Sequence, residues 1–516
     1  MIEESGFNDI PLESMNDPPP PSYKPPEIDF HRGWRDIGFT IAFWIQALLV
    51  IITGLIFGIQ SLLLLSHDDL FHQKLSKVFD LNVHVFFYSI YVAIIMAIIC
   101  SFMTIFLLEK FAALIIIISL IVIIAIEITL AISLSLIVDR SVALIPVILL
   151  VVTIIFACCI RRRIPFTAIH LQTSCTILCA HPSLLLVSIV MRVVQLLWLI
   201  CWSLLVISFI VVSVPPTANS QINQLKMTPT RRGYNLSAPE NSTLSRQEKS
   251  HLDYSFPTLG IVFLLLIPAF WGLIAFGNLD HFINACTVGR WWFPEETAQQ
   301  YLMKTSIKRA WTTNFGTICF GSLIEAIVTA FRSVVETKQR RGLCTATDLP
   351  EKLVAYINEW GFIFAALTGQ SFVEACKSLF ALFRQRGWTM ILNDSVVGYC
   401  LGIVNFLVGL LSALAGGLIF YLFEFDSSTK LFPTLYYVAS IYFLLGVILN
   451  SFVTTILTSC VRALFVCFAL NPAALGATHP DQLQKFSEVW HQVYPKEYAN
   501  SNYDQNLPLI RSKYDV

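Results

Sequence analysis

Long apolar runs dominate this chain and restrict what it can fold into. Several of them exceed the ~18 residues that mark a membrane-spanning helix. Charged residues make up only 13% of the 516 residues, which is about half the fraction found in an average soluble domain. A transmembrane barrel would instead show short segments of alternating hydrophobicity, and the sequence shows none. We therefore predict an all-α polytopic membrane protein whose helices form one bundle.

The apolar runs predict about ten transmembrane helices, each long enough for a bilayer core. We expect a disordered, Pro-rich tail over residues 1–30, a transmembrane domain over 31–470 and a polar C-terminal tail over 471–516. The eighth span has Gly369 and Gln370 in its middle, so the sequence leaves open whether it crosses fully or is broken. The expected spans are 37–65, 83–108, 111–138, 142–160, 184–214, 258–284, 308–336, 353–383, 396–423 and 435–460.

Basic residues indicate which ends of the spans face the cytosol. His31, Arg32 and Arg35 precede the first span, and the triplet 161–163 follows the fourth. Because cytosolic loops carry an excess of Lys and Arg, both observations place the N-terminus inside, and ten crossings place the C-terminus inside as well. The basic residues at 338–341 disagree, since they would lie outside. Either the eighth span does not fully cross or the charge rule yields to packing.

Glycosylation sequons give an independent indication of topology. The loop at about 215–255 follows five crossings and therefore lies outside, and it carries sequons at Asn235 and Asn241. We predict that both are glycosylated. A third sequon at Asn393 falls inside by the same count, and we expect it to remain unmodified.

The N-terminal tail contains a candidate partner motif. Pro20, Pro21, Ser22 and Tyr23 form a PPxY pattern, in which a preformed polyproline helix ends in an aromatic residue. Such segments are ligands of WW domains. The alternative is an ordinary solvated Pro-rich tail.

The seventh span carries a carboxylate among small residues. On a helix of ~3.6 residues per turn, Thr317, Gly321 and Glu325 share one stripe, which would face protein or a water-filled path. Glu374 lies in the next span, and the two carboxylates are candidates for one substrate path. The alternative is a structural ion pair of Glu325 with Arg332 or Arg192.

Two further spans supply candidates for the same path. Trp271 and Asn278 lie in the sixth span, where aromatic rings near a carboxylate would suit a quaternary ammonium. The ninth span has a stripe from Gly398 to Gly416 whose favoured interpretation is tight helix packing. Asn405 lies within that stripe and, as a buried amide, requires partners.

Several function classes are excluded or unsupported. The net charge is zero and the pI about 7.1, so nothing suggests nucleic-acid binding. The 13 cysteines are scattered without metal-site spacing, so we expect no metal and no cofactor. No Walker loop, HExxH or GxSxG motif occurs, so we expect no enzyme and no ATP-driven pump.

Residues 315–324 (FGTICFGSLI) resemble the choline transporter-like family, solute carrier family 44, and most of all its fungal and protist branch, which has an FGSICFGSLI form. We take Gly316, Phe320, Gly321 and Ser322 as the family motif. The resemblance extends over about residues 260–475. The chain departs from the family pattern where Thr317 replaces a Ser.

The resemblance implies a plasma-membrane carrier of choline or a related amine or organic cation that works by alternating access. Its substrate path would involve Trp271, Asn278, Glu325, Glu374 and Asn405, along the sixth to ninth spans. The other partner is the lipid bilayer. Alternatives are a membrane adaptor that recruits WW-domain ubiquitin ligases, and a lipid or ion facilitator.

Overall fold

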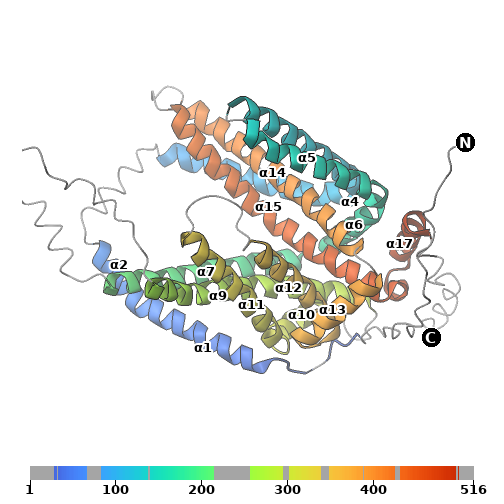
Figure 1. The fold of residues 1–516 in the computed structure, drawn as a ribbon, viewed down its shortest axis with the longest axis horizontal. Helices are drawn as coiled ribbons and strands as arrows, with labels where there is room; N and C mark the ends of the chain where they lie inside the picture. The colour runs from blue at the N-terminus through green and yellow to red at the C-terminus, as the bar shows by residue number, and fades with distance from the viewer. Residues whose placement is uncertain are drawn as a thin grey trace, which may run out of the picture.

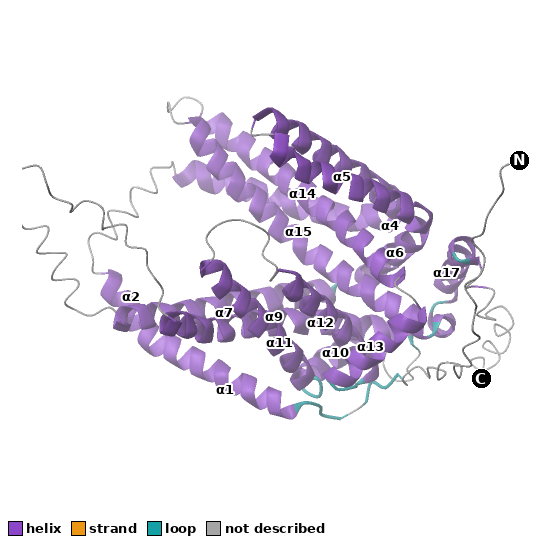
Figure 2. Cartoon of the chain, in the orientation of Figure 1, coloured by secondary structure: helices purple, strands orange, loops and turns teal. Residues whose placement is uncertain are grey.

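The computed structural model describes a helical protein (Figures 1 and 2). It describes residues 28–66 apart from 32, and residues 83–137, 140–213, 256–293, 302–338, 348–386, 389–424, 431–495 and 498. Within these ranges every regular element is a helix. The predicted all-α polytopic fold is confirmed.

The described helices follow the predicted spans closely. The first span is continuous through a short π-helical turn, and Arg161–Arg163 form a 3₁₀ turn, η2, before α6. The elements in chain order are α1 (Ile37–Thr53), η1 (Gly54–Gly58), α2 (Ile59–Ser66), α4 (Val83–Ile137), α5 (Arg140–Ile160), α6 (Ile164–Ala180), α7 (Ser183–Ser213), α9 (Phe256–Trp292), α10 (Leu302–Trp311), α11 (Phe315–Lys338), α12 (Asp348–Thr368), α13 (Phe372–Arg386), α14 (Thr389–Glu424), α15 (Leu431–Leu470), η4 (Pro472–Ala474), α16 (Leu475–Thr478) and α17 (Pro480–Val493).

Seven of the described helical segments are long and apolar enough to cross a membrane. One of them, α4, contains two helices that meet at a kink at Phe111, where φ is −126°, so it provides the predicted second and third spans. Helix α5 provides the fourth, and the consecutive helices α12 and α13 cover the eighth. The described helices therefore cover the segments of all ten predicted spans, of which α5 and the pair α12 and α13 are not among those seven.

The eighth span is broken, which answers a question that the sequence left open. Helix α12 ends at Thr368 and α13 begins at Phe372. Gly369 lies between them with φ 66°, in the left-handed region that favours glycine because it has no Cβ. The chain therefore changes direction within this span.

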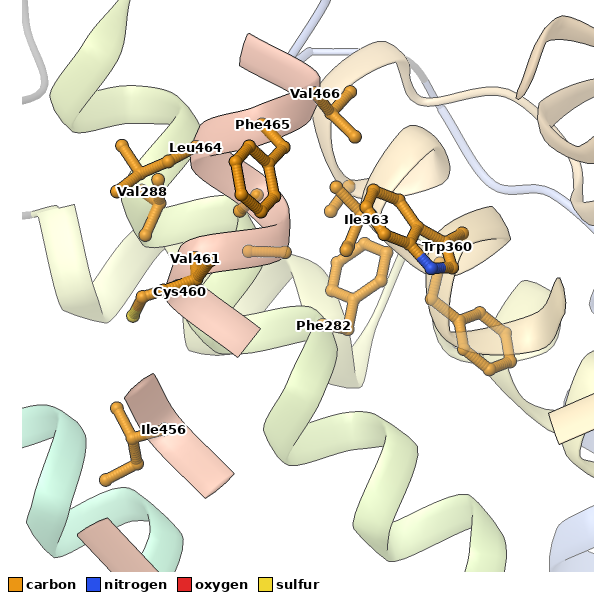
Figure 3. Packing of buried hydrophobic residues seen from close by; sticks show 14 of the residues in the cluster. Phe282, Val288, Trp360, Ile363, Ile456, Cys460, Val461, Leu464, Phe465 and Val466 are labelled. Atoms are coloured by element: carbon orange, nitrogen blue, oxygen red, sulfur yellow. The ribbon is translucent and has the colours of Figure 1, made fainter. Parts of the chain in front are cut away.

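The helices form two groups joined by α15 (Figure 1). One group contains α4, α5, α6 and α14, and the other contains α1, α7 and α9–α13. Helix α15 packs against α14 and α4 on one side and against α9, α7 and α12 on the other. Figure 3 looks into this junction, where Phe282 of α9, Trp360 of α12 and Val461 of α15 are all fully buried.

The tenth span is longer than predicted. The sequence suggested an end at Cys460, but α15 continues to Leu470. Its last two turns are largely buried against α6 and α9, and this packing keeps Arg462 inside the bundle rather than at its edge. Asn471 then ends the helix, and its side chain accepts a bond from the backbone N–H of Ala473.

The segment before α1 is tied to the bundle. Asp36 adopts a left-handed conformation with φ 52°. Its carboxylate accepts bonds from Thr317 Oγ1 at 3.0 Å and from the backbone N–H of Phe372 at 3.2 Å. Gly316 allows this arrangement, because a Cβ there would collide with the backbone carbonyl oxygens of Arg35 and Asp36.

Candidate functional site

Helix α9 carries polar side chains on two faces in the interior of the bundle. On one face Asp280 is fully buried, accepts a bond from Ser188 Oγ at 2.7 Å and pairs with Arg192 at 3.5 Å. On the other face Asn278 and His281 point toward α11, α12 and α15. The first face fastens α9 to α7, and the second belongs to the candidate site.

The small residues of α11 make room for the contacts of this site. A Cβ on Gly321 would lie 2.6 Å from ring atoms of both Phe362 and Phe372. Ser322 is fully buried, and its hydroxyl accepts a bond from Asn278 Nδ2 at 3.0 Å. The glycine and serine of the family motif therefore allow α9, α12 and α13 to approach α11 closely.

Glu325 lies half-buried in the middle of α11. Asn358 of α12 donates from Nδ2 to Glu325 Oε2 at 2.9 Å and to the backbone oxygen of Gly321, also at 2.9 Å. Within the part of the chain that the structure describes, no Lys, Arg or His forms an ion pair with Glu325. The carboxylate thus has amide donors but no balancing cation.

The structural ion pair that the sequence offered as an alternative does not form. Arg332 pairs instead with Glu336 at 3.2 Å and with Glu351 of α12. Arg192 donates to Gln195 at 2.8 Å and pairs with Asp280. Both guanidinium groups are therefore engaged elsewhere.

A second charged group lies one residue further along α12. Arg462 of α15 forms an ion pair with Glu359 and donates from Nε to Asp394 Oδ1 of α14 at 2.7 Å. His281 connects α9 to this group, since its Nε2 lies 3.0 Å from the backbone oxygen of Glu359 and its Nδ1 lies 2.6 Å from Ser459 Oγ. Because a carbonyl oxygen only accepts, Nε2 carries the proton in the neutral ring.

These contacts join into one polar layer across four helices. Its members come from α9, α11, α12 and α15, with one carboxylate from α14, and the layer is surrounded by buried aromatic and aliphatic side chains. Polar groups inside a membrane bundle are costly unless they are satisfied or face a cavity. The layer contains Asn278, His281, Ser322, Glu325, Asn358, Glu359, Asp394, Ser459 and Arg462.

Trp271 lies beside this layer. Its indole Nε1 donates to the backbone oxygen of Cys319 at 2.9 Å, and its ring meets Phe43 edge to face at 5.4 Å between centroids. The side chain is 7% exposed. In this conformation it packs α9 against α11 and α1, about two turns along α9 from the Asn278–Ser322 bond.

The structure does not bring two other predicted path residues to Glu325. Glu374 is exposed at the start of α13, where it accepts a bond from the backbone N–H of Ser371 at 3.2 Å. Asn405 lies at the contact of α14 and α15, where it donates to Thr454 at 3.0 Å and accepts from Asn450 at 2.7 Å. Asn405 has the partners that a buried amide requires, and a role of either residue in transport remains a prediction.

The glycine stripe of α14 packs in its second half only. A Cβ on Gly409 would lie 3.0 Å from the backbone oxygen of Phe443, and one on Gly416 would lie 3.0 Å from the backbone oxygen of Ser89. Gly398 and Gly402 have no neighbour within 4 Å of that position. Close helix packing is therefore present at Gly409 and Gly416 but not at Gly398 and Gly402.

The remaining motif residues hold the start of α11. Gly316 contacts the segment before α1, and the ring of Phe320 stacks on Phe39 with 4.2 Å between centroids.

The predicted glycosylation sites Asn235 and Asn241 and the WW-ligand residues Pro20, Pro21 and Tyr23 lie outside the described residues. They stay predictions. Among the residues that the structure describes, no group of three or more His, Cys, Asp or Glu side chains is placed to hold a metal ion.

Sequence reasoning missed the charged pair at the centre of the layer. Glu359 was part of the predicted eighth span, so its depth alone was a sufficient signal. Arg462 lay two residues beyond the predicted end of the tenth span and was therefore taken to lie outside the membrane. The buried segment that follows it, rich in Val, Phe and Cys, was the signal that the helix continues.

A bundle of long apolar helices with a polar layer inside it defines a multi-pass membrane protein. Comparison with known families agrees, because the model of the plasma-membrane choline transporter family matches residues 144–473. The chain belongs to this family of membrane transporters.

Individual relatives share low identity over much of the chain. It is 24% identical to Protein PNS1 of Eremothecium gossypii, over 68% of this chain and 62% of that protein. It is 23% identical to Protein PNS1 of Neurospora crassa, over 82% and 74%. It is 24% identical to a CTL-like protein of Dictyostelium discoideum, over 66% and 55%. The chain thus spans less than two thirds of the first and third of these relatives.

Proposed function

We propose that this protein carries choline or a related organic cation across the plasma membrane by alternating access. Family membership supports a transporter, and in this proposal the polar layer between α9, α11, α12 and α15 would line the substrate path. Both termini would lie in the cytosol. The helices α10, α13 and α17 gather at one end of the bundle with the start of α1 (Figure 1), and the sequence near that end is basic.

The proposal rests on Glu325, a carboxylate that has an amide donor but no ion-pair partner among the described residues. An ionised group at mid-bilayer costs at least ~2.5 kcal/mol on insertion scales, and the amide of Asn358 offsets only part of that cost. A cation arriving from solution would balance the carboxylate. The substrate suggested by this site is therefore positively charged.

The surroundings favour an organic cation over a metal ion. Amide and hydroxyl groups accompany the carboxylate, and the aromatic rings of Trp271 and Phe276, earlier in α9, pack around Phe43 of α1. A quaternary ammonium cannot donate an N–H bond and is held by ring faces and diffuse charge. Calcium or magnesium would require several oxygen ligands at short distance, and among the described residues no group of three or more His, Cys, Asp or Glu is placed to supply them.

Uptake of labelled choline into vesicles that contain the purified protein tests the proposal. We expect uptake above that of empty vesicles, inhibition by excess unlabelled choline, and at least a ~10-fold loss in Glu325→Gln, because the neutral amide removes the negative charge that would balance the cation. Glu127→Gln is the matched control. It changes an intramembrane carboxylate that binds Thr153 at the contact of α4 and α5, away from the path.

The uptake measurements can contradict the proposal in three ways. If neither choline nor ethanolamine enters faster than into empty vesicles, the organic-cation proposal fails. If Glu325→Gln transports normally while Glu127→Gln does not, the path is misplaced. Rapid, non-saturable flux of inorganic ions would instead favour the facilitator.

A further inference from the structure

Arg462 occupies a cage made of two carboxylates and two aromatic rings. Its guanidinium pairs with Glu359 and donates to Asp394. The guanidinium carbon also lies 5.6 Å from the ring centroid of Tyr356 and 6.0 Å from that of Trp360. The cage therefore combines helices α12 and α14 around a cation that belongs to α15.

This combination is the chemistry that recognises an organic cation. Ring faces within ~6 Å attract a cation through the ring quadrupole, and carboxylates balance its charge without requiring N–H donors. The other buried arginines differ. Arg309, for example, also lies over a ring, that of Phe30 at 5.4 Å, but its N–H groups donate to the backbone oxygens of Ala366 and Asp29 and to the side chain of Asn314. These neutral acceptors suit a guanidinium and not a quaternary ammonium.

The cage is open on one side. The side chain of Glu359 is 39% exposed, whereas those of Asp394 and Arg462 are 4% and 13% exposed. Trp360 is fully buried and fixes one wall. A cation can therefore reach Glu359 without first disturbing the rest of the cage.

The cage also lies next to the proposed substrate position. Asn358 contacts Glu325 on α11, and the following residue, Glu359, pairs with Arg462 on α15. Two carboxylate positions thus lie on neighbouring faces of α12. One lacks a cation in the described structure, and the other is filled by the chain's own arginine.

We propose that Tyr356, Glu359, Trp360 and Asp394 form a second site for an organic cation, which Arg462 occupies in this conformation as a tethered competitor. This proposal rests on the proposed function for the kind of cation. As the substrate moves from Glu325 around α12 to Glu359, it displaces the guanidinium. Because Arg462 joins the two groups of helices, its displacement loosens their contact and couples substrate position to the opening of the bundle.

Removing the competitor tests the proposal in the purified, full-length protein. Arg462→Ala leaves two carboxylates without their cation, so its melting temperature in sodium chloride should fall below that of the unmodified protein. Replacing the salt with choline chloride or tetramethylammonium chloride at equal ionic strength should restore much of the loss, in a saturable manner. The unmodified protein should show a smaller shift, because Arg462 already fills the cage.

Two controls connect the effect to the cage. Adding Tyr356→Ala to Arg462→Ala should weaken choline binding roughly 2- to 30-fold, the range expected for one cation–π contact. The triple variant Arg462→Ala, Glu359→Gln, Asp394→Asn should lose the added choline effect and return to the smaller shift of the unmodified protein, because its Glu325 site is intact. Arg332→Ala is the matched arginine variant. It also leaves two carboxylates behind, but its choline shift should not exceed that of the unmodified protein.

Each outcome is decisive. If choline stabilises Arg462→Ala no more than sodium does, or stabilises the triple variant equally, the proposal is overturned. Should Arg462→Ala not be obtained in any salt, the variant Arg462→Gln, Glu359→Gln repeats the test with Asp394 as the single uncompensated charge. If choline does not stabilise these variants while the unmodified protein takes up choline normally, the second site is rejected and the proposed function stands. If Arg462→Ala binds choline but the unmodified protein does not take it up, the second site stands and the proposed transport function is rejected.

Discussion

Asp36 connects three helices through one carboxylate. It begins α1, accepts a bond from Thr317 at the start of α11, and caps the N-terminus of α13 through Phe372. A negative charge at a helix N-terminus is favourable by ~0.3–1 kcal/mol, and the two bonds add to this. The residue therefore ties the segment before α1 to the break in the eighth span.

We expect Asp36→Ala to lower the stability of the purified protein by ~1–3 kcal/mol, since it leaves two donors without their acceptor and places alanine at φ 52°. Asp36→Asn should cost less, because asparagine keeps one acceptor oxygen and tolerates left-handed backbone. Thermal unfolding measures both. Asp481→Asn, at the start of α17, is the control. Equal effects of the two Asp36 variants would show that the contacts are not important.

His170 gives α6 a pH-dependent contact with the C-terminal helix. It is fully buried among Phe166, Phe465, Phe468 and Phe486, and its Nδ1 donates to the backbone oxygen of Phe166 at 2.7 Å. Burial lowers the pKa of this imidazole from 6.5 to about 3. The folded protein therefore keeps His170 neutral over a range in which the unfolded chain binds a proton.

Since the unfolded state binds more protons between pH 6.5 and 3, the stability contributed by this group is present above pH 6.5 and is lost as the pH falls. At pH 5 the loss is ~2 kcal/mol. We expect the melting temperature to fall between pH 7.5 and pH 5, and to fall less in His170→Leu. His491→Gln, on the exposed side of α17, should leave the pH dependence unchanged. A His170→Leu variant with the pH dependence of the unmodified protein would contradict this.

From the sequence, only those site residues that lie on the same helix could be predicted to lie together. Thr317, Gly321 and Glu325 share one stripe of α11, so periodicity alone brings them together. Their partners Asn358 and Asn278 come from other helices, and their register depends on packing that no local pattern records. Asp36 was beyond prediction for the same reason, since Thr317 and Phe372 are far from it in sequence.

At the scale of elements, α14 offers a direct comparison between glycines that pack and glycines that do not. A Cβ on Gly416 would lie 2.5 Å from Tyr442 and 3.0 Å from both Ser89 and Ala93 of α4. The same atom on Gly398 would meet nothing within 4 Å. The stripe therefore has two halves with opposite tolerance for a side chain.

Gly416→Ala should destabilise the protein by ~1–3 kcal/mol, because it overpacks the contact of α4, α14 and α15. Gly398→Ala, the matched control in the same helix, should be neutral or stabilising by up to ~1 kcal/mol, because alanine has the higher helix propensity. Thermal unfolding of the two variants measures the difference. Similar losses in both would mean that Gly398 also packs against a neighbour.

Elements were the scale at which sequence reasoning worked best. Hydrophobic length predicted the spans, and Gly369 marked the break in the eighth because glycine readily adopts φ 66°. The end of α15 was predicted too early, since a charged residue usually signals the membrane surface. Here the charge of Arg462 is balanced by Glu359 and Asp394, and this pairing allows the helix to continue inside the bundle.

At the scale of the whole molecule, helix connectivity makes the predicted topology testable. Thr478, just before α17, donates to the backbone oxygen of Trp292 at the end of α9, and α17 packs against α6, which leads into α7. The far ends of α7 and α9, at Ser213 and Phe256, are the ends joined by the loop that carries the sequons. If α17 is cytosolic, that loop is outside.

We therefore expect peptide-N-glycosidase to reduce the apparent mass of the protein expressed in a eukaryotic cell, and Asn235→Gln with Asn241→Gln to abolish the change. The third sequon is an internal control. Asn393 is buried, and its side-chain oxygen accepts a bond from Thr167 of α6 at 3.2 Å, so it is inaccessible to the transferase in the folded protein and lies on the cytosolic side by the same topology. Loss of the glycan in Asn393→Gln alone would invert the proposed orientation. A mass shift that survives the double variant would show that the loop after α7 is not the glycosylated one.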